Sequence, residues 1–288
     1  MAVGLALMFA MGSLISPLSA SAATQPNLGL ATGFAVLAGT TVTNTGPTVI
    51  TGDLGVSPGS SVTGFPPGTV VGNQHVSDPT AVQAQNDLGT GYTDAATAPA
   101  DADLTGQNLG GKTLTPGVYA FSSSALLSGP SPLTLSGNGV YIFKIGSTLT
   151  TASSSVVLLT NGAQGCAVFW QVGSSATFGT GSTFEGNVMA LTSITMTTGA
   201  KIVSGRALAR NGAVTLDTNQ ITAPTGTCTI PPAPTPPVGP TPTTPAVAPP
   251  NTGNPPQQPD FPWWPLAILG TIGLLLFGLR IRTYRRDS

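Results

Sequence analysis

The sequence predicts an all-β fold, a three-sided parallel β-helix with one α-helix packed against it. The first observation behind this prediction is a threonine motif that recurs at a short, nearly constant period. The second is that most of the body consists of short apolar segments separated by Gly, Asn and Ser, the pattern of strands joined by turns. The third is a single segment with helical periodicity.

The repeated motif reads Thr, an apolar residue, any residue, Thr, and then a small or turn-forming residue. It occurs at 148–152, 177–181, 195–199 and 215–219. The last three copies begin 18 and 20 residues apart, whereas an insertion that carries Cys166 lengthens the first interval to 29. A period of 18 to 20 residues is too short for a helical repeat and suits a coil with three sides.

Stacked coils would place equivalent residues of the motif above one another. Alternate side chains of a strand face opposite ways, so the apolar residue points inward and the threonines point outward. The expected inner column is Leu149, Phe178, Met196 and Leu216. Two outer ladders are expected, Thr148, Thr177, Thr195 and Thr215 in one and Thr151, Thr180, Thr198 and Thr218 in the other. A looser repeat adds Ser182 and Thr183 after Thr180, with related segments at 198–201 and from Thr45 to Thr48.

One α-helix is expected to begin after Asp78. An Asp followed by a Pro is a strong start signal, because the carboxylate caps free N–H groups and Pro79 suits the first helical position. The residues Ala81, Ala84, Leu88, Tyr92 and Ala95 then form one apolar stripe. Two glycines weaken the helix, so we expect it to lean on the β-helix.

Both ends of the chain have the composition of processing and anchoring segments. Residues 1–23 hold an apolar run that ends in Ala-Ser-Ala, which predicts a cleavable signal peptide, with an uncleaved membrane anchor as the alternative. The body is expected at 24–230. Residues 231–262, rich in Pro and Thr, predict an extended spacer. Residues 263–279 are almost wholly apolar and precede a basic tail, 280–288, which predicts a transmembrane helix with the body outside the cell.

A second way of attachment is suggested by the segment at 250–253. Its sequence, Pro-Asn-Thr-Gly, resembles the sorting signal that sortases cleave, so processing near Thr252 is an alternative to simple membrane anchoring. The sortase pattern opens with leucine, and Pro249 stands in that place. The expected location is therefore the outer face of the cell membrane, with the cell wall as the alternative.

The low charge of the chain bears on its partners. Charged residues make up only 7% of the sequence, and the body has no basic patch, which argues against nucleic acid as a partner. No nucleophile motif or phosphate-binding loop is visible, so catalysis is not expected. Asp101 and Asp103 are a pair of nearby carboxylates, which we interpret as solvated loop residues.

The histidine and the cysteines were considered as metal ligands. His75 is expected to be an ordinary loop residue, and together with two cysteines it supplies too few ligands for a metal site. Cys166 and Cys228 are expected to form a disulfide in an oxidising exterior, with two buried free thiols as the alternative. No metal and no cofactor are expected.

The threonine ladders admit a structural and a functional interpretation. Threonine is a good strand former, so the ladders could serve folding alone. A flat threonine face would also repeat at about 4.8 Å between coils and about 6.6 Å along a strand, spacings near repeats of the ice lattice. Each methyl would exclude liquid-like water, and each hydroxyl would hold an ordered water. This geometry favours ice as the partner, with Lys201 and Asp217 as charged exceptions.

Longer stretches of the body resemble a known family. They are residues 34–39, 50–59, 114–119, 168–174 and 206–214. Through them the chain, from about Leu28 to Ile221, resembles the microbial ice-binding-like domain family, first catalogued as a domain of unknown function. The resemblance implies an irregular three-sided β-helix (a solenoid) with one α-helix alongside and N-terminal strands inserted out of sequence order. It also implies that Thr-Gly/Ala-x-Thr/Asn motifs on a flat face contact ice, a pattern that residues 180–183 match in full.

Three classes of function remain open at this point. The first is ice binding, as growth inhibition or as adhesion of the cell to ice, and regular threonine rows favour it. The second is a non-catalytic surface adhesin for a polysaccharide or another cell, which exposed aromatic residues clustered on one face would favour. The third is a glycan-processing enzyme, which would require clustered carboxylates in a groove.

Overall fold

The computed structural model describes residues 23–226 and 228–230. This range contains the predicted body, except residue 227, and Ala23, the last residue of the predicted signal peptide. The rest of the signal peptide, the spacer at 231–262, the apolar segment at 263–279, the tail at 280–288 and Thr252 lie outside the described residues. No helix among the described residues is long and apolar enough to cross a bilayer.

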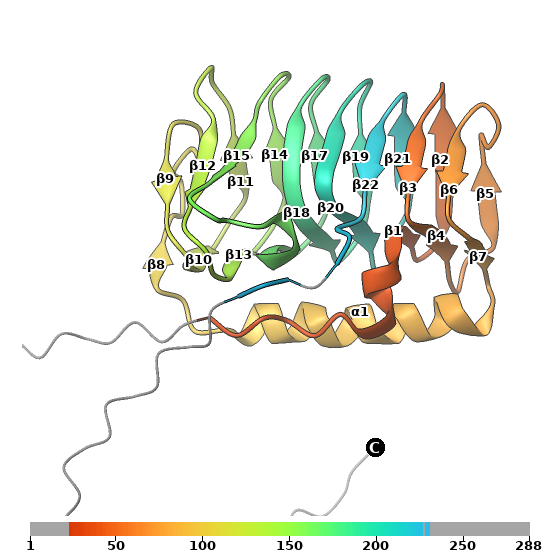
Figure 1. The fold of residues 1–288 in the computed structure, drawn as a ribbon, viewed down its shortest axis with the longest axis horizontal. Coiled ribbons are helices and arrows are strands. Elements are labelled where there is room, and N and C mark those ends of the chain that lie inside the picture. The colour runs from red at the N-terminus through yellow and green to blue at the C-terminus, as the bar shows by residue number, and fades with distance from the viewer. Residues whose placement is uncertain (1–22, 227, 231–288) are drawn as a thin grey trace, which may run out of the picture. The chain divides into compact units, whose positions relative to one another are not determined.

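The body coils into an irregular parallel β-helix with three sides (Figure 1). The first side holds β8 (Ala102–Asp103), β10 (Gly117–Phe121), β13 (Tyr141–Ile145), β16 (Val168–Val172), β1 (Phe34–Ala38), β4 (Asp53–Val56) and β7 (Gln74–Val76). The second side holds β11 (Ala125–Leu127), β14 (Leu149–Thr151), β17 (Ala176–Phe178), β19 (Ile194–Met196), β21 (Val214–Asp217), β2 (Thr41–Thr45) and β5 (Ser61–Thr63). The third side holds β9 (Thr113–Leu114), β12 (Leu133–Ser136), β15 (Val157–Thr160), β22 (Gln220–Thr222), β3 (Val49–Thr51) and β6 (Thr69–Val71).

Two long strands, β18 (Thr183–Ala190) and β20 (Lys201–Ala209), pass from the third side to the first. Each bends at a glycine, where the pairing between them shifts register between Phe184 and Gly186. Gly186 has a φ of 102°, and a Cβ there would lie 2.7 Å from the side chain of Val168. Only glycine combines that backbone conformation with that space.

The coils are not stacked in sequence order. β1, β2 and β3 pair with β20, β21 and β22, so the first coils of the chain extend the solenoid beyond its last coil. Helix α1 (Pro79–Thr97) then runs along the first side to the opposite end, where β8 begins (Figure 1). Its 19 residues span roughly 28 Å, about the height of six stacked strands. The insertion that the family resemblance implies is confirmed.

The predicted helix is confirmed, including its start and its buried face. Asp78 is the N-cap, and its carboxylate accepts a hydrogen bond from the backbone N–H of Ala81 at 2.8 Å. The predicted stripe is buried, with Ala84, Leu88, Tyr92 and Ala95 forming one cluster with apolar residues that point outward from the first side. The first side is therefore covered, whereas the other two lack such a helix among the described elements.

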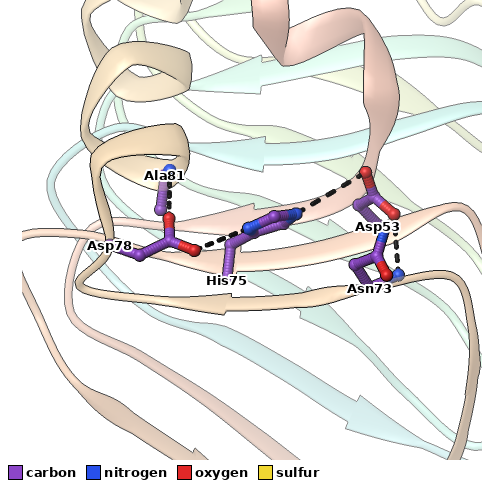
Figure 2. Close-up of polar contacts among 5 residues, drawn as sticks. All are labelled: Asp53, Asn73, His75, Asp78 and Ala81. Carbon is purple, nitrogen blue, oxygen red and sulfur yellow. Dashed lines mark hydrogen bonds and ion pairs between the residues drawn. The ribbon is translucent and has the colours of Figure 1, made fainter.

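The expectation that His75 is an ordinary loop residue is wrong. His75 lies in β7, and Figure 2 shows its imidazole between two carboxylates. Its Nδ1 is 2.7 Å from Asp78 and its Nε2 is 3.9 Å from Asp53. The N–H of Ala81, and next the imidazole, hold the pKa of Asp78 below its ordinary value. His75 thus ties the helix start to the first side, a contact between residues that local sequence does not relate.

The core is a column of aromatic and aliphatic side chains inside the coils. Phe143 stacks on Trp170 with ring centroids 3.8 Å apart, and Phe184 follows at 4.8 Å from Trp170. The predicted inner residues are all buried, but they form two columns instead of one. Leu149 pairs with Ala176 of β17. Phe178, two residues further along the same strand, pairs with Met196 and so belongs to the second column.

Two short 3-10 helices and one disulfide complete the body. They are η1 (Gly29–Gly33) before β1 and η2 (Gly165–Ala167) before β16. Cys166 and Cys228 are joined by a disulfide with a Cα–Cα distance of 5.8 Å. This bond fastens the segment after the last strand to η2, as the sequence predicts.

Candidate functional site

The second side of the solenoid displays one unbroken row of threonines, which we call the threonine row. Its members lie directly opposite one another on neighbouring strands in the order Thr150, Thr177, Thr195, Thr215, Thr43 and Thr63. All six are exposed except Thr195, which is half-buried. Leu126 of β11 continues the row beyond Thr150 and is 44% exposed.

The row exists because inward-facing and outward-facing residues alternate along each strand of this side, and the outward positions of neighbouring strands are paired with one another. The residue before each row position is fully buried in the core, as for Val42, Ile194 and Val214, except Val62 before Thr63, which is half-buried. Residues of a strand alternate between the two faces, so the threonine after it must point to solvent. Strand pairing on this side has no register shift, whereas the β1–β4 pair of the first side and the β18–β20 pair at its bend do. Unshifted pairing keeps the row straight and level.

A second line of small hydroxyl residues runs beside the row. Its members include Thr148, Ser175 and Ser193, each two residues before a threonine of the row, and Ser124, two residues before Leu126. Thr148 donates its hydroxyl hydrogen to Ser124 at 2.8 Å, and the backbone N–H of Ser193 donates to the hydroxyl of Ser175 at 3.3 Å. At the N-terminal coils Thr41 and Ser61 are paired neighbours. We use the name threonine face for the threonine row together with this hydroxyl line.

The opposite border of the face carries its single described charge. Asp217 ends β21, lies opposite Thr45, and accepts hydrogen bonds from the hydroxyls of Thr198 and Thr218. These hydroxyls hold the pKa of Asp217 below its ordinary value, with the Thr198 hydroxyl as the larger cause. The carboxylate thus accepts from protein hydroxyls at the edge of the face. The second predicted exception, Lys201, lies on the third side, opposite Thr183 and Gln220.

The first predicted ladder is correct for three of its four members. Thr177, Thr195 and Thr215 are paired, but Thr148 is displaced into the hydroxyl line and Thr150 takes the expected place. The sequence motif at 148–152 is therefore out of register by two residues with the other copies. The coil between β14 and β17 is longer, so equal motif spacing does not mean equal position on the strand.

The second predicted ladder does not form as expected. Thr151 is only 3% exposed, and its hydroxyl accepts the backbone N–H of Gly179 at 2.9 Å, so it points inward. Thr180, Thr198 and Thr218 are exposed but lie at the corner beyond the strands. There Thr180 meets the hydroxyl of Thr197 at 3.3 Å, and Thr198 contacts Asp217 instead of Thr218.

Three further predicted contact residues are also misplaced. Ser182 is 1% exposed and Thr48 is fully buried, where its hydroxyl accepts the backbone N–H of Asn219 at 3.0 Å. Thr183 is half-buried at the start of β18, on the third side. Of the threonines in the looser motifs, Thr45, Thr180 and Thr198 are exposed at the border of the threonine face. The chain turns the corner within these motifs, which buries their second halves.

Sequence reasoning missed Thr43, Thr63 and Thr150. Thr43 lies in a segment, Thr41–Thr45, whose alternation of threonine with Val42 and Asn44 is a clear strand signal. Its place in the row depends on β2 pairing with β21, a contact between the two ends of the domain that motif spacing cannot show.

The carboxylates considered for catalysis have structural contacts. Asp101 accepts the backbone N–H of Val118 at 2.8 Å, and Asp103 accepts the backbone N–H of Thr105 at 2.8 Å. Asp101 therefore joins neighbouring coils and Asp103 fixes a local turn, both at the β8 end of the solenoid. Among the described residues no cluster of three or more His, Cys, Asp or Glu side chains could hold a metal ion.

The fold and the face together define a class of protein: a β-solenoid with one helix-covered side and one level, regularly hydroxylated side. The chain belongs to the Ice-binding-like family, whose sequence model matches residues 36–222. An ice-binding protein of Nostoc sp. (strain HG1) is 58% identical over 204 residues, which cover 70% of this chain and 76% of that protein. An ice-binding protein of Flavobacterium frigoris (strain PS1) is 36% identical over 217 residues, 69% of this chain and 76% of that one.

Solved structures agree with this assignment. The crystal structure of an ice-binding protein from an Antarctic biological consortium superimposes with a TM-score of 0.69 at 48% identity, covering 73% of this chain and 96% of that chain. The DUF3494 domain of an ice-binding protein from Shewanella frigidimarina gives a TM-score of 0.66 at 30% identity, covering 71% and 100%. The fold predicted from the sequence is thereby confirmed.

Proposed function

We propose that the chain binds ice, without catalysis, through the threonine face. The observation that carries this proposal is the threonine row, six consecutive strands that present the same side chain in register. Strand spacing makes the row repeat at about 4.8 Å. The hydroxyl line adds a second repeat about 6.6 Å away along every strand of the row except β21, where Ala213 takes that position. Relatives described as ice-binding proteins support the choice of ice over other ordered surfaces.

The chemistry of the face accounts for affinity without charge. Each threonine methyl occupies space that water cannot enter and offers no hydrogen bond. The first layer of water therefore lies between the methyls, where it forms hydrogen bonds with the threonine hydroxyls. Because the coils are fixed by continuous backbone pairing, little conformational entropy is lost when the face meets a lattice. Waters ordered at these spacings join the ice surface, and the protein stays adsorbed.

The proposal extends to where the protein works. The apolar segment at 263–279 with its basic tail, together with the spacer at 231–262, would hold the body away from the outer face of the membrane. Cleavage near Thr252 by a sortase would move the attachment to the cell wall. In either arrangement the face would fix the cell to ice, so adhesion is the proposed role.

Inhibition of ice recrystallisation tests the proposal. Residues 24–230, which hold the described core, should keep ice grains small at micromolar concentration, and Thr180→Tyr and Thr198→Tyr at the border should weaken the effect. Grain growth equal to that in a protein-free control would contradict ice binding. The alternative, an adhesin for polysaccharide, would use exposed aromatic side chains, and the exposed large apolar side chains of the described part are Leu and Val.

A further inference from the structure

A cavity of about 540 Å³ lies where the two ends of the domain meet, away from the threonine face. Its walls come from the segment before β1, from η1 and η2, from β16, β18 and β20, and from the segment that ends at Cys228. None of the residues that line it belongs to the threonine face. This volume is in the range of sites that take small molecules.

A buried guanidinium forms one wall of the cavity. Arg206 is only 6% exposed, and its Nε donates to the backbone oxygen of Thr32 at 3.0 Å. One Nη also donates to that oxygen, and the other donates to the Oδ1 of Asn187 at 2.6 Å. A guanidinium has five N–H donors, so these bonds leave two unused.

The charge of Arg206 has no countercharge in the described structure. All its acceptors are neutral, and no Asp or Glu of the described residues lies within salt-bridge distance of it. Burial lowers the pKa of Arg206 to about 10, a direction that a neighbouring carboxylate would oppose. Burial of a charge without a partner is costly, and proteins normally supply one.

The guanidinium is also held in a fixed position. Asn187 is fully buried, and its amide nitrogen donates to the backbone oxygens of Val168 at 3.0 Å and Cys166 at 3.2 Å. Those bonds direct the amide oxygen of Asn187 toward Arg206. Thr32 holds the other edge through its backbone, so substitution of its side chain would leave that contact in place. The donors that remain are therefore pre-oriented, as in a binding site.

The rest of the lining is of mixed polarity, with Gln25 and Asn27 beside apolar side chains. Phe169 and Leu28 are 1% and 4% exposed and line the cavity with Pro26 and Pro224. A ligand that matches both the guanidinium of Arg206 and these apolar side chains has one planar anionic group and an apolar body. The geometry points to a small organic monocarboxylate, bound through the free N–H groups of Arg206 with its apolar body against Phe169 and Leu28. A planar guanidinium matches a carboxylate in geometry, whereas a phosphate would need donors on more sides.

Titration calorimetry on the intact chain tests this assignment with benzoate and hexanoate as probes. Both should bind, whereas their neutral amides, benzamide and hexanamide, should bind at least about tenfold more weakly because they lack the charge that the guanidinium attracts. Inorganic phosphate, which lacks the apolar body, should also be weaker. Equal binding of acid and amide, tighter binding of phosphate, or no heat from benzoate and hexanoate at millimolar concentration would each overturn the proposal.

Two variants locate the site. Arg206→Gln should lower the affinity for benzoate at least about tenfold, and Arg206→Lys, which keeps the charge but loses the planar fork, should give an intermediate value. Arg210→Gln is the matched control, because Arg210 lies over the ring of Tyr92 and does not line the cavity. Unchanged benzoate affinity in folded Arg206→Lys and Arg206→Gln proteins would overturn the assignment. If Arg206→Gln does not fold, the comparison of acid with amide on the unaltered chain still decides it.

Discussion

Thr43 lies directly beside Thr215, although the two residues belong to the first and last coils of the chain. The contact arises because β2 pairs with β21, and it joins two sets of threonines into one row. Without the inserted N-terminal coils the row would end at Thr215. The out-of-order topology therefore lengthens the surface that we propose to bind ice.

From the pairing of β2 with β21 we predict that the N-terminal coils contribute to ice binding. Thr43→Tyr places a ring between Thr215 and Thr63 and interrupts the row, so recrystallisation inhibition should fall roughly tenfold. Thr69→Tyr is the matched control, since Thr69 is exposed in β6 on the third side of the same coils. Equal activity of the two variants would show that the inserted coils do not contact ice.

Substitution of Leu126 by threonine is predicted to increase ice-binding activity. It occupies the next position of the row beyond Thr150, where it presents an apolar side chain without a hydroxyl. Leu126→Thr should extend the threonine row by one coil and lower the concentration needed to stop recrystallisation. Leu158→Thr, on the third side and 45% exposed, is the control and should change nothing. A Leu126→Thr protein no more active than the control would argue against additivity along the row.

Removal of the disulfide is predicted to lower the stability of the fold without loss of ice binding. Cys166 and Cys228 are 62 residues apart in sequence, so their bond restricts a long loop of the unfolded chain. The double variant C166S/C228S should lower the free energy of unfolding by about 2–4 kcal/mol, measured by urea denaturation. Ice activity at 0 °C should persist, because the bond lies away from the threonine face. Loss of ice activity in a folded variant would contradict that separation.

Glu185 predicts a pH-dependent contribution to stability. Burial, opposed by the N–H of Ser204, raises its pKa from 4.5 to about 7. Because the folded-state pKa is above the unfolded one, protonation favours the folded state, so this contribution is complete below pH 4.5 and is lost as the pH rises through 7. Glu185→Gln should therefore be more stable than the unaltered protein at pH 8, by roughly 1 kcal/mol after solvent screening of the half-buried group. Thermal unfolding at pH 5 and pH 8 measures this, and an unchanged difference between the two pH values in the variant would refute it.

Local signals in the sequence were sufficient for some elements of the fold. The helix after Asp78 was predictable because its cap and its apolar stripe lie within one segment. The inward position of Phe178 and the outward position of Thr177 were predictable because alternation is also local.

Register between coils was not predictable in the same way. It depends on the length of each corner, and the corners differ, so Thr151 turned inward and Thr150 took the place expected of Thr148. The place of Thr43 depends on pairing between the ends of the chain. The hydrogen-bond partners of Arg206, Thr32 and Asn187, come from two segments distant in the sequence, which is why the cavity had no signal in the sequence.

Thermal hysteresis of residues 24–230 and of the Thr195→Tyr variant tests the central claim most directly, because Thr195 is an interior member of the row, paired with Thr177 and Thr215. Thr113→Tyr, exposed on β9 of the third side, serves as the control for an added ring. The account predicts hysteresis and faceted ice crystals for the unaltered and Thr113→Tyr proteins, with a loss of roughly tenfold for Thr195→Tyr at an unchanged melting temperature of the protein. Full hysteresis in the Thr195→Tyr protein would contradict the claim that ice is bound by the threonine face.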